Sequence, residues 1–342
     1  TPQDADQLMF YKESKTGQIL QEGINEAGAL ADWIAAATSY STHGVQMLPV
    51  YICYSMFGMQ RTMDLVWAAA DQRARGFLVG GTAGRTTLNG EGLQHEDGHS
   101  HLLSATIPNC ISYDPTFAYE VAVIVQDGVR RMLAEQEDVF YYLTVMNENY
   151  EHPEMPSGSE AGILKGMYQF RKAAASNAPR VQLLGSGAIF REAIAAAELL
   201  RQDWGVEADL WSCPSFTELA RDGQDCARWN LLHPDDKPRV AHVAGCLADT
   251  RGPVIAATDY VRLFAEQIRP YVPRAYTVLG TDGFGRSDTR AKLRHFFEVD
   301  RHWITLAALR ALADEGQIDA KRVAEAIAKY ALDPNKTNPL KV

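Results

Sequence analysis

Short apolar runs alternate with longer amphipathic stretches in the first part of the chain. The apolar runs are bounded by Gly, Pro or polar residues and have the length and composition of buried strands. The amphipathic stretches carry apolar residues at helical spacing. The predicted strands are residues 50–54, 76–80, 111–113 and 139–146. The predicted helices are residues 23–41, residues 56–75 and a segment that opens at Pro115 and runs to about residue 133.

The same alternation resumes after a stretch that is rich in turn residues. Residues 150–160 contain Pro153, Pro156 and Gly158, so this segment is the best candidate for a linker. The strands predicted beyond it are residues 181–184, 209–212, 254–257 and 276–279. The helices predicted beyond it are residues 187–204, 302–312 and 319–333.

Continuous apolar strands that alternate with helices indicate parallel sheets with helices on both faces. A chain of 342 residues is long enough for about two domains. We therefore predict an α/β protein with two parallel-sheet domains, of which the first spans residues 1–155 and the second residues 156–342.

Composition and charge exclude several classes of partner. The formal net charge is -10, and nucleic-acid binding needs clustered Lys and Arg, so we expect no nucleic-acid partner. No apolar run approaches the length of a membrane span, so we expect no membrane insertion. The five cysteines are widely spaced and form no Cys-x-x-Cys pair, a pattern typical of reduced thiols in the cytoplasm.

The long polar segment at residues 81–101 is the clearest candidate for chemistry, because long ordered loops are often functional. It ends in His95, His99 and His101, with Glu96 and Asp97 among them. Imidazole and carboxylate groups at this density suit a metal ion. They equally suit proton transfer near neutral pH. A polar loop with incidental histidines is the third interpretation, and the residues alone leave all three open.

Other features have ordinary structural explanations when they are taken alone. Glu26 begins an Ala-rich helix, where a carboxylate stabilises the helix N-terminus. Tyr54 and Phe57 lie three residues apart at a helix start, as core residues often do. The Gly-Ser-Gly turn at 185–187 lacks a third glycine of the dinucleotide-binding pattern, which favours a plain strand-to-helix turn. Turn chemistry also explains the Gly-rich segment 281–288.

Several long strings change this picture, because together they resemble one known family. The strings are GRTTLNGEGLQHEDGHSH at 84–101, IPNCISYDP at 107–115, NENY at 147–150, SFTELARDG at 215–223 and GTDGFGRSD at 280–288. The sequence that contains them resembles the homodimeric bacterial pyruvate dehydrogenase subunit, a branch of the transketolase-like thiamine enzymes. The resemblance covers essentially the whole chain and implies the later part of a pyrimidine-binding domain followed by a transketolase-like C-terminal domain.

This resemblance assigns roles to individual residues. The string GINEAG at 23–28 is similar to the family motif whose glutamate contacts N1′ of the aminopyrimidine ring, so that role falls on Glu26. Tyr54 and Phe57 match aromatic residues that line the pyrimidine pocket, and His95 matches an active-site histidine. Glu26 and His95 are therefore the expected catalytic residues. Further candidates for substrate and proton handling are His99, His101 and Asp4.

The resemblance also implies cofactors and partners. The family uses thiamine diphosphate and Mg2+, and the metal is held by a Gly-Asp-Gly stretch that is not present here, so we expect no metal ligands in this chain. The implied substrate is pyruvate, and the implied partners are a second copy of the subunit and the lipoyl-bearing dihydrolipoyl acetyltransferase core. We expect the chain to be inactive alone. The alternatives are a dimerisation or docking module without its own chemistry, and a relative that acts on another 2-oxo acid.

Overall fold

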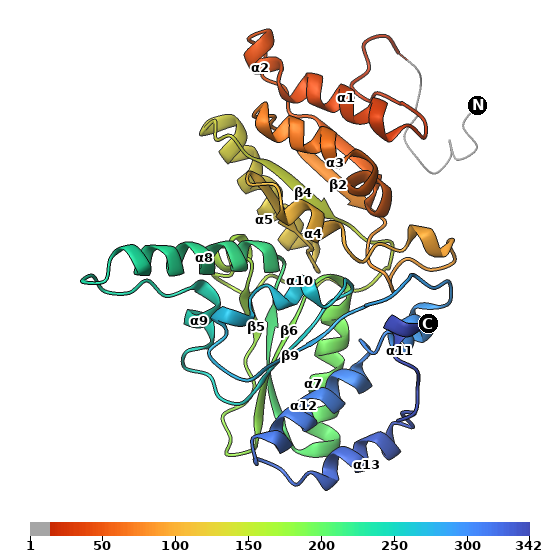
Figure 1. The fold of residues 1–342 in the computed structure, drawn as a ribbon, viewed down its shortest axis with the longest axis vertical. Helices are drawn as coiled ribbons and strands as arrows, with labels where there is room; N and C mark the ends of the chain where they lie inside the picture. Colours follow the sequence, from red (N-terminus) through yellow and green to blue (C-terminus); the bar gives the residue numbers. More distant parts are fainter. Residues whose placement is uncertain (1–13) are drawn as a thin grey trace.

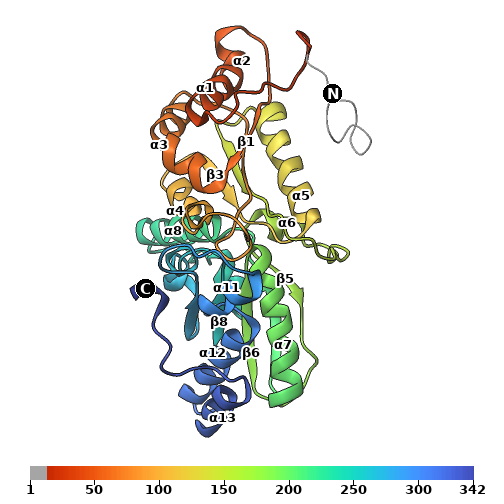
Figure 2. The same ribbon diagram turned by 90° about the vertical axis from the view of Figure 1, so that its right-hand side faces the viewer.

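The computed structural model describes residues 14–342, which form two α/β units with one sheet each (Figures 1 and 2). The first sheet has four parallel strands in the order β1-β2-β4-β3. Its strands are β1 (Val50–Tyr54), β2 (Phe77–Gly81), β3 (Cys110–Tyr113) and β4 (Phe140–Thr144). Tyr54 lies in register with Gly81, so the carboxyl ends of β1 and β2 lie side by side.

Five α-helices accompany the first sheet within the described residues. They are α1 (Glu26–Ala37), α2 (Ser39–Thr42), α3 (Ser55–Asp71), α4 (Ser100–Ala105) and α5 (Ala118–Val129), which continues as one π-helical turn at Arg130–Ala134. Trp33 of α1 is 3% exposed and its indole N–H donates to the carbonyl of Phe77, at 3.1 Å. A hydrogen bond from a buried indole to a strand carbonyl satisfies both groups and fixes α1 on the sheet.

The second sheet has five strands in the order β5-β7-β6-β8-β9. They are β5 (Tyr168–Arg171), β6 (Arg180–Gly185), β7 (Glu207–Ser212), β8 (Val254–Ala257) and β9 (Tyr276–Leu279). All neighbouring pairs are parallel except β5 and β7, which are antiparallel. An antiparallel strand at the edge of an otherwise parallel sheet is common in α/β proteins.

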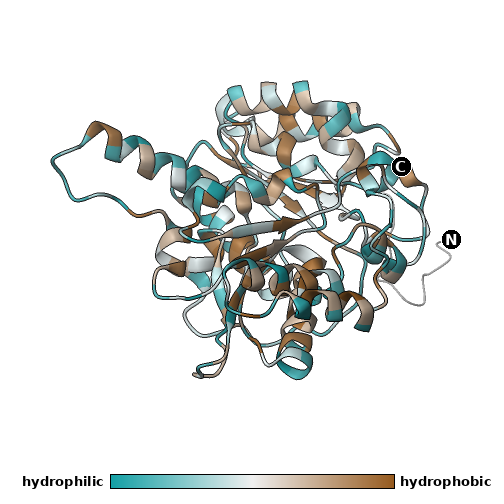
Figure 3. Ribbon diagram, turned by 60° about the horizontal axis from the view of Figure 1, so that its bottom comes forward, coloured by the Kyte–Doolittle hydropathy of each residue, from teal (hydrophilic) through white to brown (hydrophobic). Residues whose placement is uncertain are grey.

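Helices cover both faces of this sheet. The helices are α6 (Glu160–Leu164), α7 (Phe190–Trp204), α8 (Phe216–Leu232), α9 (His242–Leu247), α10 (Leu263–Glu266), α11 (Arg290–Phe296), α12 (Arg301–Asp314) and α13 (Lys321–Lys329). Leu183 packs with residues of α7 and α12, whereas Leu184 packs with residues of α8, α9 and α10. Successive strand residues thus face two different hydrophobic cores, one on each side of the sheet. Figure 3 shows hydrophobic residues along the central strands.

The predicted fold class is confirmed, with corrections in detail. The helix predicted from Pro115 begins at Ala118, because the Glu120 carboxylate accepts the backbone N–H of Thr116 and Phe117 and caps the helix there. The helix predicted at 23–41 is interrupted at Thr38. The prediction omitted β5 and six helices, namely α4, α6, α8, α9, α10 and α11.

The two units meet where strand β3 ends and strand β6 turns into a helix. Gly187 has a positive φ of 51°, and a Cβ at this position would lie 2.5 Å from a carboxylate oxygen of Asp114. Ser186 donates to the same carboxylate at 2.8 Å. The Gly-Ser-Gly segment is thus the plain strand-to-helix turn that was expected, and it also forms a contact between the two units.

Candidate functional site

The candidate site forms at the carboxyl ends of β1 and β2. Tyr54 is the last residue of β1, and Phe57 lies in the first turn of α3, which follows without a connecting loop. A Cβ at Gly58 would lie 2.2 Å from the sulfur of Cys53, so a larger residue would force the Cys53 side chain to move at this close strand-to-helix junction. The segment that follows β2 returns past this junction and carries His95 on a short 3-10 turn at Leu93–His95.

Three rings converge at this junction. The ring of Phe57 lies 4.9 Å from the imidazole of His95, and the ring of Tyr54 lies 5.5 Å from the same imidazole. Tyr54 and Phe57 are 6.1 Å apart, and all three pairs are edge-to-face. Tyr54 is 47% exposed, so part of this aromatic surface stays open. The structure therefore brings together three of the residues that the sequence assigned to the site.

Glu26 joins these rings through Arg61. The helix α1 is capped by Asn25, whose side chain accepts the N–H of Gly28 at 3.2 Å, and Glu26 is its first residue. A guanidinium nitrogen of Arg61 lies 2.7 Å from the Glu26 carboxylate, and the guanidinium carbon lies 4.1 Å from the centre of the Phe57 ring. Because the Glu26 side chain is only 18% exposed, its carboxylate lies in a partly enclosed position.

His95 has one ring nitrogen engaged and one available. Its Nδ1 lies 3.3 Å from the carbonyl oxygen of Gly92, which can only accept, so Nδ1 carries the proton in this contact. Among residues 14–342, Nε2 of His95 has no hydrogen-bond partner. This arrangement leaves a lone pair on a partly exposed imidazole, which is the state that accepts a proton.

The other two histidines of the loop serve different contacts. His99 donates from Nε2 to the side-chain oxygen of Gln60, at 2.8 Å. His101 is fully buried, lies 2.9 Å from the hydroxyl of Thr144 through Nε2, and stacks on Phe264 at 4.9 Å. Burial lowers the pKa of His101 to about 4, so its ring is neutral at neutral pH. His101 therefore lies in the core, whereas His99 is half-buried beside Gln60 of helix α3.

The histidines of the loop do not gather around one point. In the part of the chain that the structure describes, no group of three or more His, Cys, Asp or Glu side chains could hold a metal ion. Asp97 instead caps helix α4, because its carboxylate accepts the backbone N–H of His99 and Ser100 at 3.0 and 2.9 Å. Asp4, the remaining predicted site residue, lies outside the described residues.

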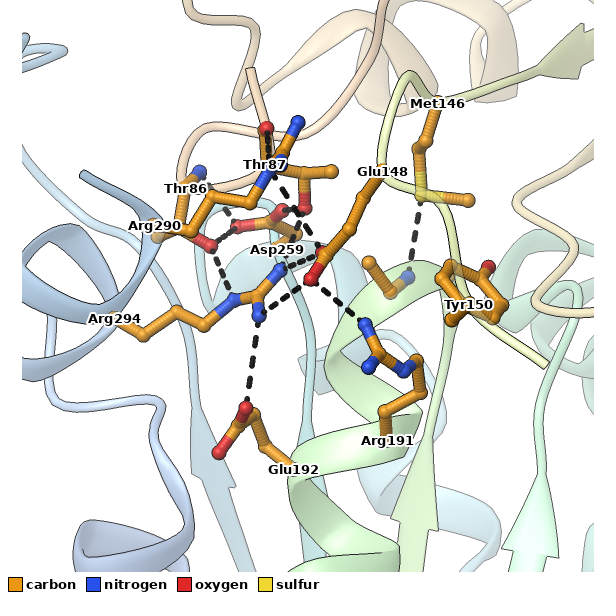
Figure 4. A network of polar contacts seen from close by, with 12 residues as sticks. Thr86, Thr87, Met146, Glu148, Tyr150, Arg191, Glu192, Asp259, Arg290 and Arg294 are labelled. Carbon is orange, nitrogen blue, oxygen red and sulfur yellow. Dashed lines mark hydrogen bonds and ion pairs between the residues drawn. The ribbon is translucent and has the colours of Figure 1, made fainter. Parts of the chain in front are cut away.

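A buried polar network fixes the loop at its base (Figure 4). We define this inter-sheet network as Thr86, Thr87, Glu148, Glu192, Asp259 and Arg294. Asp259 accepts the hydroxyl protons of Thr86 and Thr87 at 2.7 and 2.5 Å, and the backbone N–H of Thr86 at 2.8 Å. Burial raises the pKa of Asp259, and these hydrogen bonds together with Arg294 oppose that change. The second unit thereby holds the start of the loop that carries His95.

Arg294 links this base to two carboxylates. It contacts Glu148 directly and lies 3.6 Å from Glu192, and its side chain is only 6% exposed. Glu148 also pairs with Arg191 of α7 at 2.7 Å. Burial alone would raise the pKa of Glu148 and Glu192, but their arginine partners lower both below the usual range. The network therefore holds charged groups that satisfy one another.

The predictions from sequence missed Arg61 and the inter-sheet network. Arg61 lies four residues after Phe57 on the predicted helix, and this i,i+4 spacing is a signal that could have identified it. No comparable signal exists for Asp259 and Arg294. Asp259 lies 173 residues from Thr86 in the sequence, and Arg294 lies 146 residues from Glu148, so only the tertiary fold brings these pairs together.

The fold of the chain is similar to that of transketolases. It is similar to the transketolase from Leishmania mexicana with a TM-score of 0.61 and 18% identity, over 93% of this chain and 38% of that one. It is similar to the transketolase from Campylobacter jejuni with a TM-score of 0.60 and 16% identity, over 81% of this chain and 38% of that one. At these identities the likeness concerns the fold alone.

Sequence comparison finds nearer relatives. Residues 1–153 match the pyruvate dehydrogenase E1 component middle domain, and residues 166–300 match the transketolase-like C-terminal domain. The chain is similar over its whole length to part of the pyruvate dehydrogenase E1 component. It is 78% identical over 342 residues to the pyruvate dehydrogenase E1 component of Cupriavidus necator, and 62% identical over 341 residues to that of Escherichia coli.

The chain spans 38% of the length of both relatives, and it is matched over 100% and 99% of its own length respectively. The activity of a whole relative therefore concerns more residues than this chain contains. Among the described residues, no helix is both long enough and apolar enough to cross a membrane.

Proposed function

We propose that this chain supplies part of the active site of a thiamine-diphosphate-dependent pyruvate dehydrogenase E1 component. That enzyme would decarboxylate pyruvate oxidatively and transfer the acetyl group to a lipoyl group. The observation that supports this proposal most strongly is the convergence of Glu26, Tyr54, Phe57 and His95 at one sheet edge. These residues lie in the part of the chain that matches the pyruvate dehydrogenase E1 component middle domain.

The residues present fit an aminopyrimidine ring. A flat heterocycle needs aromatic surface for orientation and a hydrogen-bonding group at a ring nitrogen. Tyr54 and Phe57 provide partly open rings, and Glu26 provides a carboxylate that is only 18% exposed. Arg61 balances the charge of that carboxylate. Both requirements are therefore present at this site.

Each residue has a distinct role in this proposal. Glu26 would hold a proton at N1′ of the aminopyrimidine, since a partly enclosed carboxylate can share a proton with a ring nitrogen. Tyr54 and Phe57 would orient the ring. His95 would move a proton through its Nε2, which is the available ring nitrogen. When bound, thiamine diphosphate supplies the electron sink that decarboxylation of a 2-oxo acid requires.

The remaining assignments concern proton handling, the metal ion, the domains and the partners. His99 and His101 are weaker candidates for proton handling, and the burial of His101 favours a structural contact. We assign Mg2+ and the diphosphate group to residues outside this chain, since the chain contains no Gly-Asp-Gly stretch. Residues 1–155 would form the pyrimidine-binding part and residues 156–342 the C-terminal domain. A second subunit and a dihydrolipoyl acetyltransferase core would be the partners, and the cytoplasm the compartment, with all five cysteines free.

A substitution in the full-length polypeptide tests the role of Glu26. Glu26→Gln keeps the size of the side chain but removes the acid, so the release of CO2 from pyruvate should fall by about 100-fold or more. Glu160→Gln is the matched control, because Glu160 also lies in the first turn of a helix and is exposed. An unchanged rate in Glu26→Gln would contradict the proposal and support a dimerisation or docking role.

Two further assays address the chain and the substrate. The chain alone, with added thiamine diphosphate and Mg2+, should release no CO2, and clear turnover would refute this expectation. The full-length enzyme should prefer pyruvate to branched 2-oxo acids. The reverse preference would assign the protein to a different 2-oxo acid.

A further inference from the structure

A large cavity lies away from the residues of the proposed active site. Its volume is about 800 Å3, and its walls come from the segment after β4, strand β5 and the starts of α7 and α12. Small-molecule sites typically have volumes of about 300–1,000 Å3. None of the residues that line it belongs to the cluster of Glu26, Tyr54, Phe57 and His95. We call it the linker cavity, because residues 150–153 form one of its walls.

Three arginines from three different elements line the linker cavity. They are Arg171 of β5, Arg191 of α7 and Arg301 of α12, and their side chains are 45%, 34% and 47% exposed. Glu151 is the one carboxylate among the lining residues. Each of these arginines is paired with a glutamate, so the cavity offers an anion a set of guanidinium N–H donors rather than a local excess of positive charge.

Each arginine is held on one side and available on the other. Arg171 pairs with Glu198 at 3.0 Å, and Arg191 with Glu148 at 2.7 Å. Within residues 14–342, the Nε and Nη2 atoms of Arg191 have no hydrogen-bond partner, nor do the Nε and Nη1 atoms of Arg171. An anchored guanidinium loses little conformational freedom on binding, and its remaining N–H groups can bind a carboxylate or phosphate in a bidentate manner.

Arg301 has the same property. Its Nε and Nη2 atoms donate to the two carboxylate oxygens of Glu192 at 2.9 and 3.0 Å. The Nη1 atom has no partner in the described part of the chain. His152 adds one more donor. Its Nδ1 accepts the backbone N–H of Ala118 at 3.1 Å, so the proton of the neutral ring lies on Nε2.

The rest of the wall is aromatic and aliphatic. Phe117 and Phe170 are stacked, with their ring centres 5.4 Å apart and their planes at 21°. Tyr150 and His152 form a second pair at 4.9 Å, and Ile194 of α7 adds an aliphatic surface. Aromatic rings offer both their faces and their edges to another flat ring. The cavity therefore combines an apolar surface for a ring with cations for an acidic group.

We propose that the linker cavity binds a small aromatic anion, in which a flat ring carries a phosphate or carboxylate group. The acidic group binds the arginines, and the ring packs on the aromatic wall. This proposal is independent of the thiamine-dependent reaction. Phenyl phosphate is a suitable probe, since it contains both parts, while inorganic phosphate and benzyl alcohol each contain one.

Calorimetric titration of the full-length polypeptide tests the proposal. Phenyl phosphate should bind at one site per chain, and about tenfold or more tightly than either inorganic phosphate or benzyl alcohol. Benzoate should also bind, because its carboxylate offers the same bidentate geometry. No saturable binding of phenyl phosphate at concentrations up to about 10 mM would overturn the proposal, as would equal affinity for the three probes.

Two variants locate the bound probe. Arg171→Met should weaken binding of phenyl phosphate by about tenfold, whereas Arg201→Met should leave it unchanged. Arg201 is a matched control, because both arginines pair with Glu198 but only Arg171 lines the cavity. Ala195→Trp fills the cavity without removing an ion pair and should abolish binding. Binding that survives both Arg171→Met and Ala195→Trp would place the probe elsewhere and refute the assignment.

Discussion

The molecule contains two polar clusters that differ in how completely their members are satisfied. We define the surface cluster as Glu26, Tyr54, Phe57, Arg61 and His95. In the surface cluster, Tyr54 and Arg61 are about half exposed, and His95 has an available ring nitrogen. In the inter-sheet network, Asp259 is 1% exposed and accepts three hydrogen bonds.

This difference separates groups that can bind a ligand from groups that hold the fold. A side chain with unused hydrogen-bonding capacity at the surface can exchange water for a ligand at little cost. A buried charged group must keep its partners, since losing one leaves an uncompensated charge. One segment links the two clusters, because the loop that carries His95 begins at Thr86 and Thr87, the two threonines bound by Asp259.

Removal of Arg294 should have the largest effect on stability. Arg294→Met leaves the carboxylates of Glu148 and Glu192 partly uncompensated, and these side chains are only 13% and 7% exposed. Loss of one member of a buried ion pair typically costs ~3–5 kcal/mol. Urea denaturation should show this loss in the free energy of unfolding.

The control for this prediction lies on helix α12. Arg310 pairs with Asp314, and both side chains are more than half exposed. Arg310→Met should change the free energy of unfolding by less than ~1 kcal/mol. If the two variants were equally stable, the inter-sheet network would not be a structural element, and the comparison would lose its basis.

Asp259→Asn should cause the next largest loss of stability, and it should also loosen the loop at residues 84–101. An amide cannot accept all three hydrogen bonds that the carboxylate accepts from Thr86 and Thr87. The expected loss of stability is ~2 kcal/mol. Amide hydrogen exchange of residues 84–101 should accelerate, as measured by mass spectrometry.

An exposed aspartate provides the control for this measurement. Asp249 lies on the surface of the same unit, and Asp249→Asn should leave exchange in residues 84–101 unchanged. Unchanged protection of the loop in Asp259→Asn would show that the loop keeps its position without the network.

The sequence predicted the sheets well because their strands are continuous apolar runs. The predicted strand at residues 50–54 has the same bounds as β1, and those at 254–257 and 276–279 have the same bounds as β8 and β9. Helix α8 escaped prediction, although Ser215 caps it by accepting the N–H of Glu218 at 3.0 Å. Its buried and polar residues follow a helical period, but the sequence analysis used this segment only for the family resemblance and predicted no helix there.

The candidate site was predicted on different grounds. The family resemblance pointed to Glu26, Tyr54, Phe57 and His95, and local spacing explains only why Tyr54 and Phe57 are neighbours. His95 reaches them because β1 and β2 are adjacent in the sheet, which sequence patterns alone do not state. The inter-sheet network depends on contacts between distant segments, so no local pattern reveals it.

The buried carboxyl group of Asp114 should make the stability of the fold depend on pH, and this effect should be smaller than those of Arg294→Met and Asp259→Asn. Asp114 is buried beside Ser186 and Thr144, and burial raises its pKa to about 7. The folded state then binds a proton between about pH 4 and 7 that the unfolded state has released. Stability from this residue therefore falls as the pH rises through that window, with a slope of up to ~1.4 kcal/mol per pH unit.

Asp114→Asn should remove this contribution. The free energy of unfolding, measured by urea denaturation between pH 4 and 7, should then decline less steeply with rising pH. Glu96→Gln should act in the same direction, because burial raises the pKa of Glu96 to about 7. A steeper decline in Asp114→Asn would show that Asp114 is ionised in the folded state throughout this range.

Arg61→Met should have the smallest effect of all on stability. The ion pair with Glu26 is at the surface, and the Arg61 side chain is 51% exposed, so its loss should cost less than ~1 kcal/mol. Arg73→Met is the matched control, since Arg73 pairs with Asp138 and is 70% exposed. Urea denaturation should give similar free energies for the two variants. A loss as large as that of Arg294→Met would instead show that the ion pair of Arg61 and Glu26 stabilises the fold as strongly as the inter-sheet network does, and the distinction between the two clusters would fail.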